Sequence, residues 1–435
     1  MPGLPRASAH RLETFNDWKF GLFVHFGPWA QTGHAKIWDM VRLPAAERGD
    51  WTHLNRTFNP TKFDPSVWAR AARQAGMRYA YFTTKHHDGF CNWATRTTAF
   101  SVAGADCPVS RWRDPDLVGQ VASAMRAEGL AYGHYYSHID WSQPDGRRFS
   151  FGHPDYDPAA VHSDPAAWRR WVAFETAQVE ELLTRYGKVD LMWWDIAWPI
   201  VVSDPSDMPN SIRRPYADPV VADAMTRLIA RVRTLAPELI MNERGVQPYA
   251  DYVSPEQSVP AIPPPGPWEA AITVTGPGRR EVGGFWWQGA NASYKSTAKL
   301  IRALCEVASR GGNLLLGVGP NPDGELPPEE LHRLAEIGTW MGINGEAIYG
   351  THAGGVEAPW GMATRKERYL YLLVFDRPAA GEPLRVPGRN AAREAVLLGT
   401  GKPLAIGGSA DGGLTLTWPD APRHPVADVV RLRLA

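Results

Sequence analysis

The feature that most constrains the fold of this chain is a repeated order of strand-like and helix-like segments. Eight short apolar runs end in polar or turn-forming residues, and most are separated by segments with helical spacing and capping signals. Strands that alternate with helices form a parallel sheet, and eight such units close into a barrel. The predicted strands are Lys19–Phe26, Met77–Thr84, Leu130–Ser137, Val189–Asp195, Leu239–Asn242, Asp251–Val253, Gly283–Gln288 and Asn313–Val318.

The pattern changes in two places, and both changes affect the domain organisation. No helix is evident between residues 251 and 280, so we expect the (β/α)8-like barrel to be degenerate there. After about Asn344, short apolar runs alternate with Gly- and Pro-rich turns, which is typical of an antiparallel β-sandwich. We therefore expect a catalytic barrel over residues 1–345 and a C-terminal β-sandwich over residues 346–435. The predicted strands of this sandwich are Arg368–Phe375, Glu394–Leu398, Gly413–Trp418 and Val429–Leu434.

The fourth predicted strand of the barrel, V-D-L-M-W-W-D, carries an aspartate at or near each end. Asp195 is its last residue, and it follows Trp193 and Trp194. A buried carboxylate beside two tryptophans is costly unless a charged partner or a reaction uses it. Barrel enzymes place their active sites at the C-terminal ends of the strands and structural residues at the opposite ends. We therefore predict that Asp195 is catalytic and that Asp190 is structural.

Composition excludes several classes of protein. Lys+Arg and Asp+Glu both number 46, and the resulting zero net charge offers no basic field for nucleic acid or an anionic membrane. The three cysteines are too widely spaced for a disulfide framework or a zinc knuckle. No apolar run has the length of a signal-peptide core or a membrane span. We therefore expect a cytoplasmic protein, and the sequence leaves its oligomeric state unknown.

Polar and aromatic side chains gather at the predicted strand ends. Histidines and arginine bond hydroxyl groups, and aromatic rings face the apolar side of a sugar, so this set suits a neutral polyhydroxyl ligand. The 19 tryptophans of the chain also favour an aromatic-lined pocket. Two carboxylates are the usual equipment for hydrolysis of a glycosidic bond. The residues concerned are His25, His86, His87, Asp88, Tyr135, Tyr136, Trp193, Trp194, Asp195, Arg244, Glu256, Trp286 and Trp287.

The sequence His86-His87-Asp88 leaves alternatives open. Histidine and aspartate at a strand end can bind a metal ion, with His25 as a further ligand. Neighbouring strand residues point to opposite faces, so His86 and His87 reach one ion only where the chain bends. The histidines could instead bond a ligand or be structural. Arg244 could clamp a ligand, hold a carboxylate ionised or form a salt bridge at the barrel rim.

At these residues the chain resembles the α-L-fucosidases of glycoside hydrolase family 29. The resemblance covers about residues 10–351 and implies a (β/α)8-like barrel with a C-terminal β-sandwich, retaining hydrolysis of α-L-fucosides, and neither metal nor cofactor. The matching motifs are K-F-G-L-F-V-H-F-G (19–27), F-D-P-S-V-W-A-R-A-A-R-Q-A-G (63–76), T-T-K-H-H-D-G-F (83–90), Y-Y-S (135–137), V-D-L-M-W-W-D (189–195), S-P-E-Q (254–257), P-W-E (267–269), G-G-N-L-L-L-G-V-G-P (311–320) and N-G-E-A-I-Y-G-T (344–351).

The resemblance also implies roles for individual residues. Asp195 matches the nucleophile. Glu256 of S-P-E-Q is the first choice for the acid/base and Glu269 of P-W-E the second, because this position varies within the family. For retention, the two carboxyl groups should lie roughly 5–5.5 Å apart. The implied sugar-binding residues are His25, His86, His87, Tyr135, Trp193, Arg244, Glu269 and an aromatic over the sugar's methyl group, Trp286 or Trp287.

One stretch departs from the family pattern and leaves the sugar open. Many members carry Glu-Trp-Tyr in the first long loop, where the glutamate bonds the sugar, but this chain has Ile37-Trp38-Asp39. Either Asp39 takes over this bond or the bond is absent, so Trp38 and Asp39 join the predicted substrate-binding residues. The expected partner is a fucosylated oligosaccharide or glycoconjugate. The alternatives are an enzyme for a related sugar such as an α-L-galactoside, a catalytically silent sugar-binding barrel, and a metal-dependent barrel hydrolase.

Overall fold

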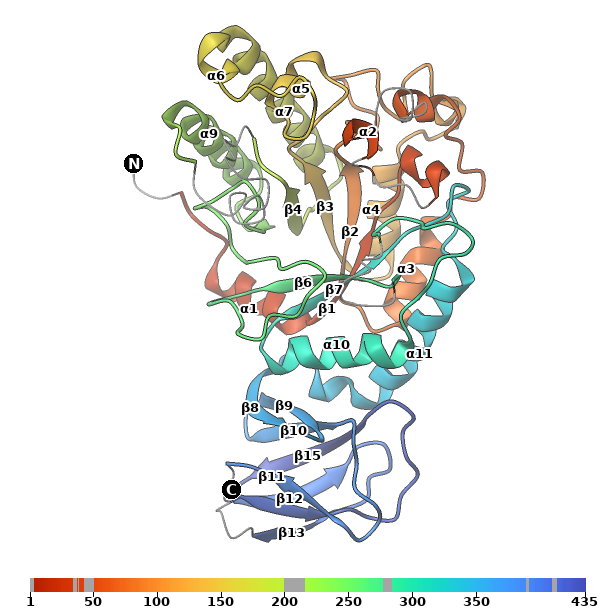
Figure 1. Ribbon diagram of the computed structural model, residues 1–435, viewed down its shortest axis with the longest axis vertical. Helices are drawn as coiled ribbons and strands as arrows, with labels where there is room; N and C mark the ends of the chain where they lie inside the picture. The colour runs from red at the N-terminus through yellow and green to blue at the C-terminus, as the bar shows by residue number, and fades with distance from the viewer. Residues whose placement is uncertain are drawn as a thin grey trace.

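The computed structural model describes residues 4–33, 37, 39–42, 51–198, 216–276, 284–388, 391–408 and 413–435. A parallel sheet covered by helices takes up most of the chain, and antiparallel sheets follow at its C-terminal end (Figure 1). In this described part of the chain, no helix has the length and apolar character needed to cross a membrane.

Seven strands form one parallel sheet in the order β5-β4-β3-β2-β1-β7-β6. Nearly all of their residues are buried, because helices cover the outer face and side chains fill the inner face. The strands are β1 (Phe20–Val24), β2 (Tyr79–Lys85), β3 (Ala131–Ser137), β4 (Leu191–Asp195), β5 (Ile240–Met241), β6 (Glu269–Thr273) and β7 (Asn313–Val318).

Most of the long helices begin at the capping signals of the sequence. Asp64, Asp116, Asp164, Asp218 and Ser296 each accept a hydrogen bond from a backbone N–H of the first helical turn. The helices are α1 (Ala9–Trp18), α2 (Asp39–Arg42), α3 (Pro65–Gln74), α4 (Leu117–Ala127), α5 (Pro144–Phe149), α6 (Ala160–Ser163), α7 (Pro165–Arg185), α9 (Pro219–Leu235), α10 (Thr297–Ser309) and α11 (Pro328–Asn344). Short 3-10 helices occupy η1 (Pro28–Thr32), η2 (Trp51–Arg56), η3 (Pro108–Arg111) and η5 (Gly345–Ala347).

The sheet curls around its own inward-facing side chains. One hydrophobic cluster contains residues from all seven strands, together with Phe15 of α1 and Tyr252. Single bridges connect the two edge strands through residues 252–256, since Asn242 pairs with Tyr252, and Glu256 pairs with Ala271 of β6. The structure therefore has a curled, seven-stranded parallel sheet whose edges are joined by an irregular segment.

Two of the eight predicted strands are corrected by the structure. Residues 284–288 form no strand, and Gly283 lies outside the described residues. The strand in this part of the chain is β6, which was missed because E-A-A-I-T has little strand character while F-W-W-Q is strongly apolar. Asp251–Val253 makes only single bridges, because the Asp251 carboxylate takes the Met241 N–H. The barrel prediction is thus confirmed only in part, because the described residues form a curled parallel sheet of seven strands.

Two antiparallel sheets form the C-terminal region. The larger has the order β12-β15-β10-β9-β8 and the smaller β11-β14-β13. Along β10, Leu370 and Leu372 join a core shared by both sheets, while Tyr371 and Leu373 belong to the core of the parallel sheet and its helices. The strands are β8 (His352–Ala358), β9 (Gly361–Lys366), β10 (Tyr369–Val374), β11 (Pro383–Val386), β12 (Ala392–Leu397), β13 (Ala405–Gly408), β14 (Leu414–Thr417) and β15 (Asp428–Leu434).

The four strands predicted for this region correspond to β10, β12, β14 and β15. The other four were missed because β8, β9 and β13 contain glycines and β11 begins with a proline, which weaken a strand pattern.

Candidate active site

A cavity of about 290 Å³ opens at the C-terminal end of the parallel sheet. Its walls come from the ends of β1 to β4 and from segments that follow β5 and β6, so residues far apart in sequence meet there. The lining residues are Phe23, His25, Ile37, His86, His87, Tyr135, Trp193, Asp195, Ile196, Arg244, Glu256, Gln257, Gly284, Phe285, Trp286 and Gln288.

Three charged side chains form the centre of this cavity. Arg244 Nη1 lies 2.9 Å from Asp195 Oδ1, and Arg244 Nη2 lies 2.8 Å from Glu256 Oε2. One guanidinium therefore joins two carboxylates that belong to different segments of the sheet. The Asp195 side chain is 11% exposed and that of Glu256 is 39% exposed, so water reaches Glu256 more easily.

Further donors fix the Asp195 carboxylate. The Tyr135 hydroxyl donates to Asp195 Oδ2 at 2.6 Å, and the Ile196 backbone N–H donates to Asp195 Oδ1 at 3.0 Å. Hydrogen bonds to a charged acceptor are stronger than those between neutral groups. Burial and the neighbouring Asp195 charge raise the pKa of Tyr135, so its hydroxyl keeps the proton that it donates. The carboxylate is therefore held in one orientation at the end of β4.

Arg244 remains charged although it is buried. Burial disfavours the charge, but the carboxylates of Glu256 and Asp195 raise the pKa of Arg244 above its usual value. Its guanidinium carbon lies 4.3 Å from the ring centroid of Trp193, which adds a cation–π contact. Of the three roles that the sequence left open for Arg244, its place inside the cavity corresponds to the partner of a carboxylate.

Three histidines line the cavity as neutral rings. Strand β2 ends at Lys85, and the chain then turns, with the Gly89 N–H donating to the His86 carbonyl at 3.0 Å. This turn supplies the bend that lets both His86 and His87 face the cavity. Burial lowers the pKa of His25, His86 and His87, for His87 to about 3. A neutral imidazole both donates and accepts a hydrogen bond, as a sugar hydroxyl does.

A metal ion is the rival ligand for these rings. Ligand atoms of His86, His87 and Asp195 all lie within 4.8 Å of one another. Arg244, however, donates to the same Asp195 carboxylate at 2.9 Å, and its positive charge opposes a cation at this place. Asp88 does not line the cavity, and burial raises its pKa to about 8. The arrangement therefore favours sugar hydroxyls over a metal.

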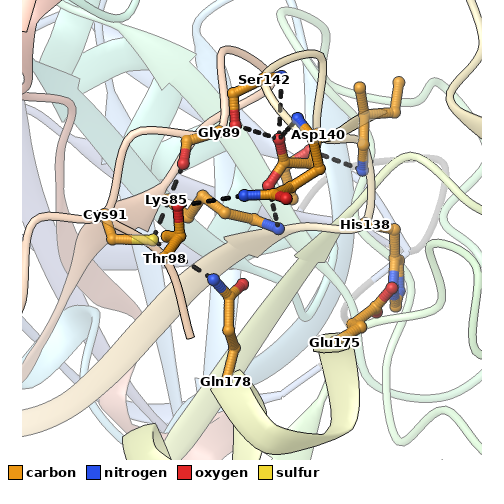
Figure 2. A network of polar contacts seen from close by, with 12 residues as sticks. Lys85, Gly89, Cys91, Thr98, His138, Asp140, Ser142, Glu175 and Gln178 are labelled. Atoms are coloured by element: carbon orange, nitrogen blue, oxygen red, sulfur yellow. Dashed lines mark hydrogen bonds and ion pairs between the residues drawn. The ribbon is translucent and has the colours of Figure 1, made fainter. Parts of the chain in front are cut away.

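A polar network joins Lys85, at the end of β2, to Gln178 of α7 through the Tyr136 hydroxyl (Figure 2). Lys85 and Asp140 have no exposed surface and form an ion pair at 3.4 Å, and Lys85 also donates to the Tyr136 hydroxyl at 3.0 Å. Asp140 packs directly against the turn, because a methyl group added to Gly89 would lie 2.1 Å from Asp140 Oδ1. This network therefore fixes the turn that presents His86 and His87.

The structure does not bring every predicted site residue into the cavity. Trp286 lines it, whereas Trp287 is not among the lining residues. Glu269 begins β6 at the opposite end of the sheet, where the Tyr79 hydroxyl donates to its Oε2 at 2.6 Å. Because this carboxyl is fully buried in the sheet interior, the structure does not support Glu269 as acid/base or as a sugar-binding residue.

The first long loop is described only in part. Trp38 lies outside the described residues, as does the side chain of Asp39, whose backbone begins α2. Ile37 is described, is 1% exposed and lines the cavity. An apolar side chain thus stands at the position where the family resemblance predicted a sugar-binding glutamate.

Several lining residues were not identified from the sequence. They are mostly apolar or amide side chains, which carry no chemical signature of their own: Phe23, Ile37, Ile196, Gln257, Phe285 and Gln288. Alternation along β1 could have found Phe23, because it points to the same face as Gly21 and His25. The rest depend on how loops fold over the sheet.

A curled parallel sheet with two carboxylates, neutral histidines and aromatic walls at its C-terminal end defines a glycoside hydrolase type of site. A family model described as alpha-L-fucosidase matches residues 6–346, which is most of the chain. The tissue alpha-L-fucosidase of Homo sapiens is 26% identical, in a match that covers 95% of this chain and 86% of that protein.

Solved structures agree with this match. Alpha-L-fucosidase isoenzyme 1 from Paenibacillus thiaminolyticus is 33% identical, with a TM-score of 0.81 and coverage of 98% of this chain and 99% of that chain. An alpha-L-fucosidase from Bacteroides thetaiotaomicron, solved as a trapped covalent intermediate with 2-fluoro-fucosyl fluoride, is 26% identical, with a TM-score of 0.79 and coverage of 100% and 98%. The chain belongs to the alpha-L-fucosidase family and is a glycoside hydrolase, as the motifs indicated.

Proposed function

We propose that this protein hydrolyses α-L-fucosides with retention of configuration, using Asp195 as nucleophile and Glu256 as acid/base. The observation that carries the proposal is the bridge of Arg244 between these two carboxylates in an aromatic-walled cavity. Retaining glycosidases need one carboxylate on each side of the anomeric carbon. The covalent intermediate trapped in the Bacteroides relative supports a double displacement.

In the first step, an Asp195 oxygen attacks the anomeric carbon, and the bond from that carbon to the leaving oxygen breaks. Glu256 gives its proton to the leaving oxygen, so that the leaving group departs as a neutral alcohol. The product is a glycosyl ester on Asp195 and a Glu256 carboxylate. Arg244 and the Tyr135 hydroxyl orient Asp195 for this attack.

In the second step, water replaces the leaving group. Glu256 now takes a proton from the water, whose oxygen attacks the anomeric carbon and releases the Asp195 carboxylate. Two inversions give net retention. The partial exposure of Glu256 suits both steps, because the leaving group departs and the water enters on its side of the cavity.

The cavity supports a single terminal sugar as the bound unit. His25, His86 and His87 can pair with ring hydroxyls, and the buried Nδ1 of His25 has no hydrogen-bond partner among the described residues. Phe285 and Trp286 supply an apolar wall that suits the methyl group of fucose. An α-L-galactoside would place a hydroxyl there, so we expect its kcat/KM to be about 10- to 100-fold lower.

We also propose that residues 1–345 form the catalytic unit and that 346–435 form a β-sandwich that braces it. The Trp340 indole of α11 donates to the Ala427 carbonyl at 3.1 Å. The Arg302 guanidinium of α10 lies 4.2 Å from the ring centroid of Phe375. Both contacts support one face of the larger antiparallel sheet as a permanent packing surface for α10 and α11.

The test is release of 4-nitrophenol from 4-nitrophenyl α-L-fucoside, followed by azide rescue of two variants. Asp195→Gly should lose hydrolysis and, with azide, give the inverted β-L-fucosyl azide, because azide takes the place of the nucleophile. Glu256→Gly should give the retained α-L-fucosyl azide, because azide attacks the glycosyl-enzyme. A chelator should leave the parent rate unchanged. If Asp195→Gly gave the α-azide and Glu256→Gly the β-azide, Glu256 would be the nucleophile and Asp195 the acid/base. An inactive parent would contradict the proposed substrate.

A further inference from the structure

Two residues beside the proposed catalytic carboxylates have a backbone conformation that their side chains disfavour. Four non-glycine residues among those described have a positive φ: Lys19 (60°), Ile196 (60°), Gln257 (53°) and Glu367 (51°). Ile196 directly follows Asp195, and Gln257 directly follows Glu256. Only glycine adopts this left-handed region without strain, and a β-branched residue such as isoleucine is a rare outlier there.

Lys19 and Glu367 have ordinary structural reasons for this conformation. Lys19 lies between the end of α1 and the start of β1, and Glu367 lies in the two-residue connection between β9 and β10. Helix ends and tight hairpins commonly contain left-handed residues. Ile196 and Gln257 end no helix and close no hairpin, so their conformation requires another explanation.

Tertiary packing maintains the conformation of Ile196. Its side chain is 7% exposed and belongs to a cluster with Trp29, Ile37 and Trp286. A methyl group added to Gly245 would lie 2.6 Å from the Ile196 carbonyl oxygen, so the backbone after Arg244 passes directly against this turn. The turn at Ile196 therefore packs on one side against the cavity wall and on the other against the segment that carries Arg244.

Strand β6 maintains the conformation of Gln257. The Gln257 N–H donates to the Ala271 carbonyl at 2.8 Å, and its side-chain Oε1 accepts from the Thr273 N–H at 3.3 Å and from the Thr273 hydroxyl at 3.2 Å. The preceding Glu256 pairs with Ala271. Backbone and side chain of Gln257 thus both attach the Glu256 segment to the sheet.

We propose that Ile196 and Gln257 are positioning residues whose left-handed backbone fixes the directions from which Asp195 and Glu256 enter the cavity. This inference rests on the proposed function. A residue with a Cβ has a narrow range of backbone angles in the left-handed region, whereas glycine has a broad one. The side chain therefore restricts the motion of the neighbouring carboxylate. Backbone strain that surrounding structure maintains clusters at functional sites.

Matched pairs of variants separate this restraint from other effects of the side chain. Ile196→Ala and Ile196→Gly both remove the isoleucine side chain, but only glycine removes the backbone restraint. Gln257→Ala and Gln257→Gly form the second pair. Glu367→Gly is the control, because Glu367 has the same conformation far from the cavity in sequence and lies in the antiparallel region.

We expect stability and catalysis to change in opposite directions within each pair. Each glycine variant should melt about 1–2 °C above its alanine partner, because glycine relieves the strain. Its kcat/KM on methyl α-L-fucoside should nevertheless be about tenfold lower than that of its alanine partner, because a poorly aligned reacting group lowers the rate. Inhibition by L-fucose should stay within about twofold, because ground-state binding does not depend on this alignment. Glu367→Gly should raise the melting temperature and leave kcat/KM unchanged.

The leaving group distinguishes the two positions. Methyl α-L-fucoside needs a proton on its leaving oxygen, whereas the 2-chloro-4-nitrophenyl fucoside does not. Relative to Gln257→Ala, Gln257→Gly should lose kcat/KM on the methyl fucoside and hardly at all on the activated one. Ile196→Gly should lose it on both, because both need the nucleophile.

Equal kcat/KM values on methyl α-L-fucoside for the alanine and glycine partners would overturn the inference, even if stability changes as expected. Failure of the proposed function would look different. In that case Glu256→Ala itself would show no dependence on the leaving group, whatever the effect of the Gln257 variants. If Glu256→Ala shows the dependence and the Gln257 pair does not, only the inference fails.

Discussion

The two ends of the parallel sheet bury the same kinds of charged residue and use them differently. At the N-terminal end, Asp251 accepts hydrogen bonds from Arg233 at 2.8 Å and from the backbone N–H groups of Met241 at 2.9 Å and Ala7 at 3.2 Å. At the C-terminal end, Asp195 also pairs with an arginine, but its side chain lines a cavity. Both carboxylates have partners, so the number of partners does not distinguish structure from function.

Strand β4 and the residue before it show this contrast over a few positions. Asp190 precedes β4 at the N-terminal end of the sheet. Its Oδ1 lies 2.6 Å from Arg11 Nη2 and 2.8 Å from Lys188 Nζ. Asp195 ends β4 and faces the space where a ligand fits. What distinguishes the two ends is open volume beside the charge. A carboxylate that protein atoms enclose on all sides stabilises the fold, whereas one that faces a cavity is available to a substrate.

Exchanging each of these aspartates for asparagine gives the largest expected contrast. Asp195→Asn should lower kcat about 10⁴-fold, equivalent to roughly 5–6 kcal/mol of activation free energy, because the amide is a poor nucleophile. Asp190→Asn should leave kcat unchanged and lower the free energy of unfolding by about 1–3 kcal/mol, because two cations lose their partner. Steady-state kinetics and urea unfolding of both variants measure this. Equal catalytic losses would remove the distinction between the two ends.

The two arginine pairs give the next largest effect. Arg233→Met leaves the fully buried Asp251 without its cation, and breaking such a pair should cost about 3–5 kcal/mol of unfolding free energy. Arg244→Met should lower kcat/KM about 10²- to 10³-fold, because one guanidinium orients both proposed catalytic carboxylates. Its effect on unfolding should be smaller, since the cavity lets water reach Asp195. A larger loss of stability in Arg244→Met than in Arg233→Met would contradict this order.

Glu269 gives a pH-dependent contrast with Glu256. Burial raises the pKa of Glu269 from 4.5 to about 8, so the folded state favours the protonated carboxyl. The stability it contributes is fully present below pH 4.5 and is lost as the pH rises through 8. Between pH 5 and 8, Glu269→Gln should therefore gain on the order of 3 kcal/mol of unfolding free energy relative to the parent. Melting curves across this range measure it, and kcat/KM should not change, whereas Glu256→Gln should lose activity.

The smallest contrast compares two buried tyrosines that donate to carboxyl groups. Tyr135→Phe removes a bond to the charged Asp195 and should lower kcat/KM about tenfold, or roughly 1.4 kcal/mol. Tyr79→Phe removes the bond to Glu269 and should lower the unfolding free energy by about 1 kcal/mol without a catalytic effect. A catalytic loss in Tyr79→Phe as large as that in Tyr135→Phe would show that the two ends are coupled.

Much of the site could be read from the sequence because strand ends in a parallel sheet meet at one edge. His25, His86, Tyr135 and Asp195 each end or follow an apolar run, so their meeting follows from the fold class. Glu256 and Glu269 could not be separated in this way. Glu256 comes directly after Pro255 and Glu269 two residues after Pro267, in a stretch without clear periodicity. Only the position of β6 sends Glu256 to the cavity and Glu269 into the interior.

The sequence by itself determined the order of most strands and helices of the parallel sheet, the candidate carboxylates and the family, because these depend on local pattern and motif. The tertiary structure alone decided which carboxylate shares Arg244 with Asp195, that both histidines after β2 face the cavity, and that Ile37, Phe285 and Trp286 form its wall. It also decided which residues take the left-handed conformation. These features arise where distant segments pack together, and a local pattern does not encode the contacts between them.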